Sequence, residues 1–120
     1  MAGLESATFE SPDEVRPFQG HGHMDVVHLS SGDVGRGTFE PGWRWSQDVK
    51  PIAGTDSCQV EHIGYVQSGR MTVRMDDGTE HTYGPGETFH MPPGHDAWTV
   101  GEEPCVMLDF GGLKGYAQGG

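Results

Sequence analysis

The sequence predicts an all-β fold, a sandwich or barrel of short strands in a single domain. The chain has 120 residues, enough for one hydrophobic core, and its 20 Gly and 8 Pro residues interrupt it at short intervals. Between these residues lie stretches of strand length, and no long segment repeats its apolar residues with the period of a helix. Short strands joined by Gly- and Pro-containing turns are typical of sandwiches and barrels.

The N-terminal residues 1–18 are polar, and we expect them to form an arm outside the barrel. Within this arm, Ser11 and Pro12 are the residue types of a helix N-cap and first helical position, so a single helical turn is expected there. The barrel is expected over 19–112, and 113–120 are expected to form a frayed tail.

Eight strand candidates follow, each bounded by turn residues. They are 24–30, 37–40, 58–67, 70–75, 79–83, 87–91, 97–100 and 105–110. The clearest is 70–75, where three apolar residues alternate with three polar ones. Asp77 and Gly78 come directly after it and predict a hairpin, with positive φ at the glycine.

The charge balance argues against two classes of partner. Seven Lys and Arg residues against 18 Asp and Glu residues give a net charge of −11, which repels nucleic acids and anionic membrane surfaces. The longest apolar run has about four residues, far below the roughly 20 that span a bilayer. No secretory signal is expected at the N-terminus, and we interpret Cys58 and Cys105 as reduced thiols, so we expect a cytoplasmic protein.

The region 41–110 resembles the cupin superfamily in two spaced motifs. Residues 65–71, YVQSGRM, resemble the turn that closes the first cupin motif. Residues 86–94, GETFHMPPG, match the second motif, which is a glycine, five residues and then P-x-G. The resemblance implies a cupin-type β-barrel (jelly roll) with a pocket for a small molecule in its interior.

The standard cupin metal ligands are absent from their usual positions. His62 occupies the place of the glutamate in the first motif, and Ala97 that of the histidine in the second. The H-x-H pair of the first motif has no direct counterpart. His21 and His23 have chelating spacing, but they lie outside the resembling region, in what we interpret as a loop.

Three other residues are candidate metal ligands: Cys58, His62 and His95. Cys58 and His62 are four residues apart in the expected strand 58–67, so they share one face, which lines the barrel if the cupin register holds. His95 lies two residues before Ala97, on the same side if the strand already runs there. Thiolate and imidazole suit Zn, Ni or Fe, and the resemblance adds Mn. A buried thiol, a hydrogen-bonded core histidine and a turn histidine remain the alternatives.

Candidates for the pocket are Trp43, Trp45, Lys50, Tyr65 and Trp98. Aromatic walls are common in small-molecule pockets, and packing at a barrel end explains the tryptophans equally well. Lys50 could bind an anionic substrate at the pocket mouth or be a solvated surface residue.

Three interpretations of the function follow from the sequence, of which the third is a purely structural, dimerising barrel. The first is a metal-dependent cupin that acts on a small molecule as a dioxygenase, isomerase or decarboxylase. The alternative is a metal-free small-molecule binding or sensor module, and the sequence leaves open whether the protein is an enzyme. Small cupins commonly pair their barrels, so we expect a homodimer in which 24–29 is the exposed strand edge.

Overall fold

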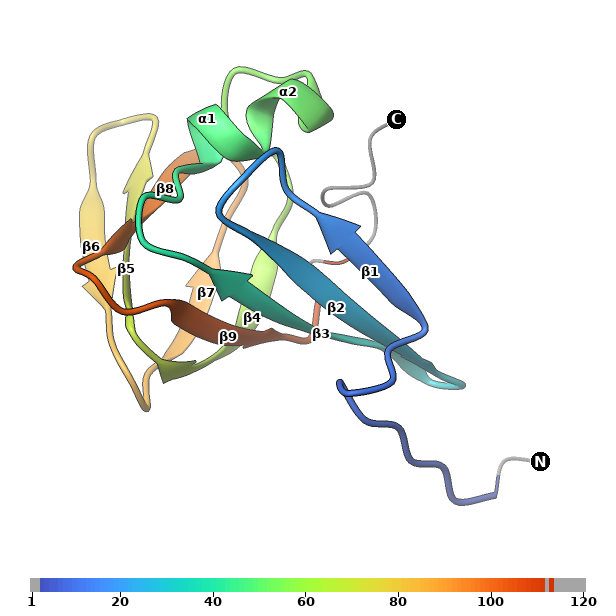
Figure 1. Cartoon of the computed structure of the whole chain (residues 1–120). Coiled ribbons are helices and arrows are strands. Elements are labelled where there is room, and N and C mark those ends of the chain that lie inside the picture. The colour runs from blue at the N-terminus through green and yellow to red at the C-terminus, as the bar shows by residue number, and fades with distance from the viewer. Residues whose placement is uncertain (1–2, 112, 114–120) are drawn as a thin grey trace.

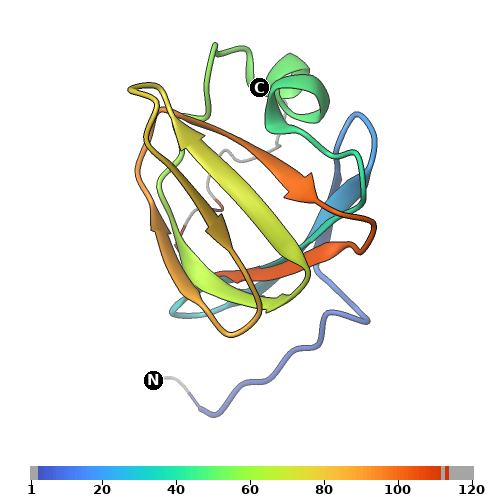
Figure 2. The ribbon, with the colours of Figure 1, turned by 90° about the vertical axis from the view of Figure 1, so that its left-hand side faces the viewer.

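The computed structural model describes residues 3–111 and 113, and it confirms the all-β fold. A six-stranded antiparallel sheet has the order β1-β2-β3-β9-β4-β7, and a three-stranded sheet has the order β6-β5-β8. The two sheets face each other around the core, and two short helices lie at one end (Figures 1 and 2). The strands are β1 (Glu14–Pro17), β2 (Gly22–Leu29), β3 (Gly32–Phe39), β4 (His62–Ser68), β5 (Arg70–Met75), β6 (Glu80–Tyr83), β7 (Thr88–Met91), β8 (His95–Val100) and β9 (Cys105–Asp109). The helices are α1 (Trp45–Asp48) and α2 (Lys50–Ala53).

The predicted hairpin is confirmed, and β5 has the predicted bounds. Met71 and Val73 on its apolar face are buried. The Asp77 side chain accepts a hydrogen bond from the Thr79 N–H at 2.9 Å, and Gly78 has a φ of 93°. Strand β6 then returns antiparallel to β5.

The alternation of side chains decides what faces the barrel interior. On β4 the buried positions are His62, Gly64 and Val66, and on β9 they are Cys105, Met107 and Asp109. On β8 they are His95, Ala97 and Thr99. Two histidines and an aspartate therefore lie on faces that are otherwise apolar or small.

The predicted helical turn at Ser11 and Pro12 is wrong. The chain enters the six-stranded sheet directly, because the Asp13 N–H donates to the Val26 carbonyl at 3.0 Å and β1 then pairs with β2. Phe18, the last residue of the expected arm, is buried in the core.

Strand β2 is an interior strand of its sheet, so the expectation that 24–29 forms the exposed edge is wrong. Its register with β1 pairs Glu14 with Val26 and Pro17 with His23. His23 therefore lies in a strand rather than a loop, while His21 sits in the preceding turn with a φ of 62°. The homodimer itself stays a prediction.

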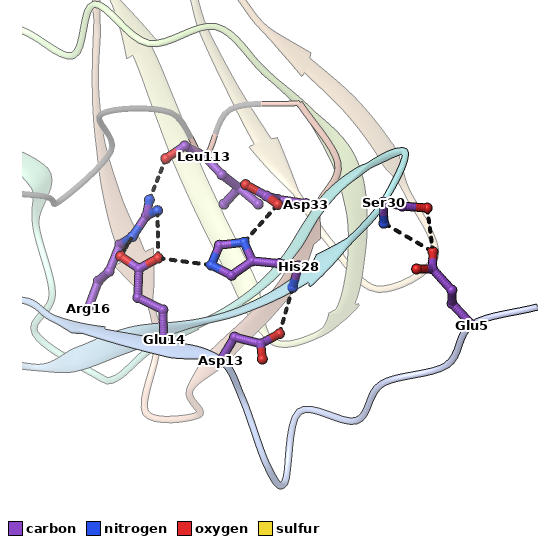
Figure 3. Close-up of polar contacts among 8 residues, drawn as sticks. All are labelled: Glu5, Asp13, Glu14, Arg16, His28, Ser30, Asp33 and Leu113. Atoms are coloured by element: carbon purple, nitrogen blue, oxygen red, sulfur yellow. Dashed lines mark hydrogen bonds and ion pairs between the residues drawn. The ribbon is translucent and has the colours of Figure 1, made fainter. Parts of the chain in front are cut away.

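A network of hydrogen bonds and ion pairs links the N-terminal segment to the rest of the barrel (Figure 3). The buried Arg16 side chain donates to Glu14 at 2.7 Å and to the carbonyl of Leu113. His28 lies 2.8 Å from Asp33, and Glu5 accepts two hydrogen bonds from Ser30. Leu113, the first residue of the expected tail, is buried, and 114–120 lie outside the described residues.

Neither helix was predicted, because four residues are too few to show a helical period. Helix α1 is held by two carboxylates: Asp48 accepts from the Arg44 N–H at 3.1 Å, and Asp96 accepts from the Ser46 N–H at 3.0 Å. In the described part of the chain, no helix has the length and apolar character that crossing a membrane requires.

Candidate metal centre

Cys58, His62 and His95 come together in the barrel interior, and we refer to them as the ligand cluster. Each offers one donor atom, and the three donor atoms lie within 4.8 Å of one another. All three residues are buried, with exposed fractions of 2%, 6% and 3%. The Sγ atom of Cys58 lies 3.7 Å from Nε2 of His62.

Different elements position the three side chains. His62 is the first residue of β4, and His95 is the first residue of β8. Cys58 lies outside any strand, so the expected strand 58–67 begins four residues later than predicted. The backbone of Cys58 pairs with His95 instead. The Cys58 N–H donates to the His95 carbonyl at 2.7 Å, and the Cys58 carbonyl accepts from the Gly94 N–H at 2.6 Å.

Hydrogen bonds fix the orientation of both imidazoles. Nδ1 of His62 donates to Oδ2 of Asp109 at 2.7 Å, and Nδ1 of His95 donates to the Pro92 carbonyl at 2.7 Å. In the neutral form of each ring the proton is on Nδ1, so the lone pair of Nε2 is available to bind a metal ion. Metal-binding histidines in proteins are commonly held in this way by a carboxylate or carbonyl.

The charges of the cluster are coupled. Burial alone would raise the pKa of the Cys58 thiol, but hydrogen bonds from His62 and His95 outweigh it and lower this pKa to about 6. Burial likewise opposes the charged form of His62, but Asp109 and Cys58 raise the pKa of its imidazole to about 9. Cys105 behaves differently, because burial raises the pKa of its thiol to about 12. Cys58 is thus the thiol suited to ligation or nucleophilic chemistry.

A cavity of about 30 Å³ adjoins the cluster. Its wall includes His62, His95 and Asp109 and is otherwise mainly apolar, with the thioethers of Met24, Met71, Met91 and Met107 and the rings of Phe39, Trp43, Trp45 and Phe89. The empty space has room for about two water-sized groups.

The structure brings together some of the predicted pocket residues and leaves others outside. Trp43 and Trp45 line the cavity, whereas Lys50, Tyr65 and Trp98 do not. Trp98 faces outward because its neighbours in β8 face inward, and its ring lies 4.4 Å below the Arg44 guanidinium.

Tyr65 and Lys50 lie at the surface for similar reasons. Tyr65 alternates with the buried Gly64 and Val66 of β4, and 39% of it is exposed. Lys50 begins α2 and lies 3.7 Å from the exposed Asp56. Neither side chain can therefore serve as a wall of this cavity.

Asp109 is the site residue that sequence reasoning missed. It stands 47 positions after His62, and only the pairing of β4 with β9 brings the two together. A signal was present, because Asp109 continues the buried series of Cys105 and Met107. A carboxylate on an apolar strand face is a candidate partner for another buried polar group.

Two comparisons with known sequences bear on this site. The model of the family described as "Cupin domain" matches residues 50–111, which include the whole ligand cluster. A non-reducing end alpha-L-arabinofuranosidase from Bacteroides ovatus, BoGH43B, is 29% identical over 127 residues covering 84% of this chain. The chain spans only 22% of the length of that relative.

Solved structures share the fold. The polyketide cyclase RemF from Streptomyces resistomycificus has a TM-score of 0.64 at 17% identity, covering 92% of this chain and 80% of that one. An RmlC-like cupin from Shewanella frigidimarina has a TM-score of 0.62 at 15% identity, covering 93% and 95%.

Proposed function

The chain belongs to the cupin domain family, and on this premise we propose that it binds a divalent metal ion inside its barrel and acts there on a small molecule. Cys58, His62 and His95 hold the ion. The observation that carries the proposal is the convergence of three buried donor atoms within 4.8 Å, with both imidazoles oriented through Nδ1.

The spacing of the donors suits a shared ion. Bond lengths of roughly 2.3 Å to sulfur and 2.0 Å to nitrogen place two tetrahedral ligands about 3.5 Å apart. The Sγ of Cys58 and Nε2 of His62 lie 3.7 Å apart. Three protein ligands leave a fourth position for water or substrate, as in catalytic zinc sites.

The donor types narrow the choice of metal. One thiolate and two imidazoles favour zinc, iron(II) or nickel, whereas manganese prefers oxygen ligands. When bound, such an ion polarises a carbonyl oxygen or lowers the pKa of a water molecule. The protein itself positions the ligands and shields the site. Asp109 holds His62 in one tautomer, and the apolar wall keeps bulk water out of the cavity.

The reaction we propose is of the dioxygenase, isomerase or decarboxylase type found among similar metal cupins. Support for an enzymatic role comes from the polyketide cyclase RemF, which has the same fold and is named for a reaction on a small organic molecule. The volume of about 30 Å³ restricts the substrate to a small group at the ion unless side chains of the wall rearrange.

The test is the metal content of untagged protein after dialysis against a weak chelator. We expect one ion per chain in the wild type and none in His62→Ala, with both proteins folded by circular dichroism. His81→Ala and His90→Ala are the matched controls, because both histidines are exposed and lie outside the cluster. Folded wild-type protein that takes up no ion even after incubation with zinc, iron(II) or nickel would overturn the proposal.

A metal-free binding module is the second candidate function. The cluster can stand without an ion, because His62 already contacts Cys58 and Asp109, and His95 already bonds to Pro92. In that case a thermal-shift screen with small carboxylates and sugars would find ligands for protein that carries no metal.

A further inference from the structure

Two tryptophans of the cavity wall carry buried hydrogen-bond donors without an acceptor. The indole N–H groups of Trp43 and Trp45 are the buried side-chain nitrogen or oxygen atoms that lack a partner among the described residues. Each tryptophan is 2% exposed. Leaving a buried donor unpaired costs about 1–3 kcal/mol, and phenylalanine in the same place would avoid that cost.

Both rings are held firmly at this wall. Trp43 packs edge-on against Phe39, with ring centroids 4.6 Å apart, and its carbonyl accepts a hydrogen bond from the Thr99 N–H at 3.0 Å. Trp45 begins α1, and the N–H of the next residue, Ser46, is anchored by Asp96. Because packing fixes the rings, the two donors have little freedom to find an acceptor elsewhere in the protein.

The other polar groups of the cavity already have partners. Asp109 and His62 bond to each other, and His95 bonds to Pro92. The remaining wall is mainly the thioethers and aromatic rings described above. A molecule entering the cavity therefore meets mainly apolar surface that includes both tryptophan rings, together with His62 and His95. The two indole donors are the groups of this wall that are left without an acceptor.

We propose that Trp43 and Trp45 bind an oxygen acceptor, a carbonyl or carboxylate, on a small and otherwise apolar organic molecule. This inference rests on the proposed function, because it names the ligand class of the same cavity. The methionines contact the apolar part of the ligand, and their flexible side chains enlarge the cavity beyond its present 30 Å³.

The chemistry of the wall favours an oxygen acceptor over other ligand classes. An ammonium group offers only donors, so it would leave both indoles unpaired and face an apolar wall. A hydrocarbon would fill the space but would also leave the two donors without an acceptor. An oxygen with two lone pairs satisfies one or both donors and gains van der Waals contact with the wall.

The test follows the indole N–H signals of the full chain by ¹H–¹⁵N NMR. The probes are propionate, propionamide and propylamine, which have similar size and differ in the polar group. We expect propionate or propionamide to shift the Trp43 and Trp45 signals downfield to saturation, and propylamine to leave them in place. Trp98 is the internal control, because its ring lies outside the cavity beside Arg44.

Phenylalanine variants assign the signals and measure the contribution of each donor. Trp43→Phe and Trp45→Phe keep an aromatic ring and remove the N–H. Each substitution should lower the affinity for the probe about 3- to 10-fold. Cavity signals that stay fixed with all probes, or a Trp98 shift of equal size, would overturn the proposal. Equal probe affinity in wild type and both variants would do the same.

The titration is run on both metal-loaded and chelator-treated protein, so the two proposals fail separately. If the protein takes up no metal, the proposed function is wrong. The indole signals of the metal-free protein then still show whether the tryptophans bind the probe. Protein that takes up metal but shows no change at the indoles defeats only this inference.

Discussion

Asp109 bonds to His62 diagonally across the β4–β9 pair, because the residue directly opposite Asp109 is Gly64. A Cβ atom on Gly64 would lie 1.9 Å from the Leu108 carbonyl oxygen and 2.6 Å from the Phe89 ring. The glycine therefore allows β9 to approach closely and leaves the Asp109 side chain free to reach the histidine. The orientation of one candidate ligand depends on a residue with no side chain of its own.

We expect Asp109→Asn to weaken metal binding about 10- to 100-fold, because the neutral amide no longer supports the basicity of His62. Competition with a chromophoric chelator measures the affinity. Asp56→Asn is the matched control, since Asp56 is exposed, lies 3.7 Å from Lys50 and is not part of the ligand cluster. Equal losses in both variants would show that the effect is general electrostatics rather than the bond to His62.

Metal affinity should depend on pH through Cys58 and His62. In the metal-free protein the pKa of Cys58 is lowered to about 6 and that of His62 is raised to about 9, so between these values the pair is thiolate and imidazolium. An ion must displace the proton of His62 in this range, so affinity should fall about tenfold for each pH unit below 9. Below about pH 6 it should fall more steeply, because the thiol must lose its proton as well.

The same pair should leave the free energy of unfolding of the metal-free protein nearly constant between about pH 6.5 and 9. The raised pKa of His62 contributes stability that is lost as pH rises through 9, and the lowered pKa of Cys58 contributes stability that is lost as pH falls through 6. Between these limits the Cys58–His62 pair binds about one proton in the folded protein and about one in the unfolded protein, so the free energy of unfolding does not change with pH. Urea titrations over this range, together with the affinity series, check both statements; an affinity independent of pH would contradict the ion pair.

Replacing Arg16 with Gln should destabilise the protein by about 2 kcal/mol. The substitution breaks the ion pair with the partly exposed Glu14 and the hydrogen bond to the Leu113 carbonyl (Figure 3). Urea denaturation measures the change, and Arg74→Gln, at an exposed position of β5, should stay within about 0.5 kcal/mol of wild type. If both variants unfold at the wild-type urea concentration, the network does not stabilise the fold.

Gly78→Val should destabilise the β5–β6 hairpin by about 1 kcal/mol or more, because a β-branched residue resists the φ of 93° at this turn. Space is not the reason, since a Cβ atom here would meet nothing within 4 Å. Gly78→Asn should cost less, because asparagine tolerates positive φ better. The melting temperatures of the two variants give the comparison, and equal values would contradict a conformational origin.

We expect light scattering to return twice the chain mass of 13.0 kDa, as for a homodimer. Ile63, Tyr65 and Phe110 are exposed apolar residues, and the Phe110 N–H bonds to the Ile63 carbonyl, so two of them lie together. Ile63→Lys should shift the species to the monomer mass, whereas Val100→Lys, on the other sheet, should not. A wild-type monomer at micromolar concentration would contradict the prediction.

The sequence predicts most where one local pattern decides the structure. Strand β5 and its Asp77-Gly78 turn were found because alternation and turn chemistry agree within ten residues. The convergence of Cys58, His62 and His95 was predicted on a partly wrong premise: Cys58 is not in a strand with His62 but is bound to His95 by its backbone. The sequence could not show that bridge, because it joins residues 37 positions apart.

The positions of the pocket candidates that lie outside the cavity have a related cause. Trp98 faces outward because it alternates with the buried Ala97 and Thr99 of β8. Asp109 was missed because its role depends on which strand lies beside β4, and strand order is not visible in local patterns. Local sequence patterns therefore predict the strands, whereas the site depends on the pairing of strands that are distant in the sequence.

The backbone hydrogen bonds between Cys58 and His95 hold two of the three candidate ligands together whether or not an ion is present. In a zinc finger the ligands meet only when the metal binds, so a chelator unfolds the domain. Here the sheet has already closed the long chain segment between the two residues, and the loss of chain entropy belongs to folding rather than to metal uptake. A chelator should strip the ion and leave an intact barrel, so metal supply would set the fraction of protein that is loaded without changing the fraction that is folded.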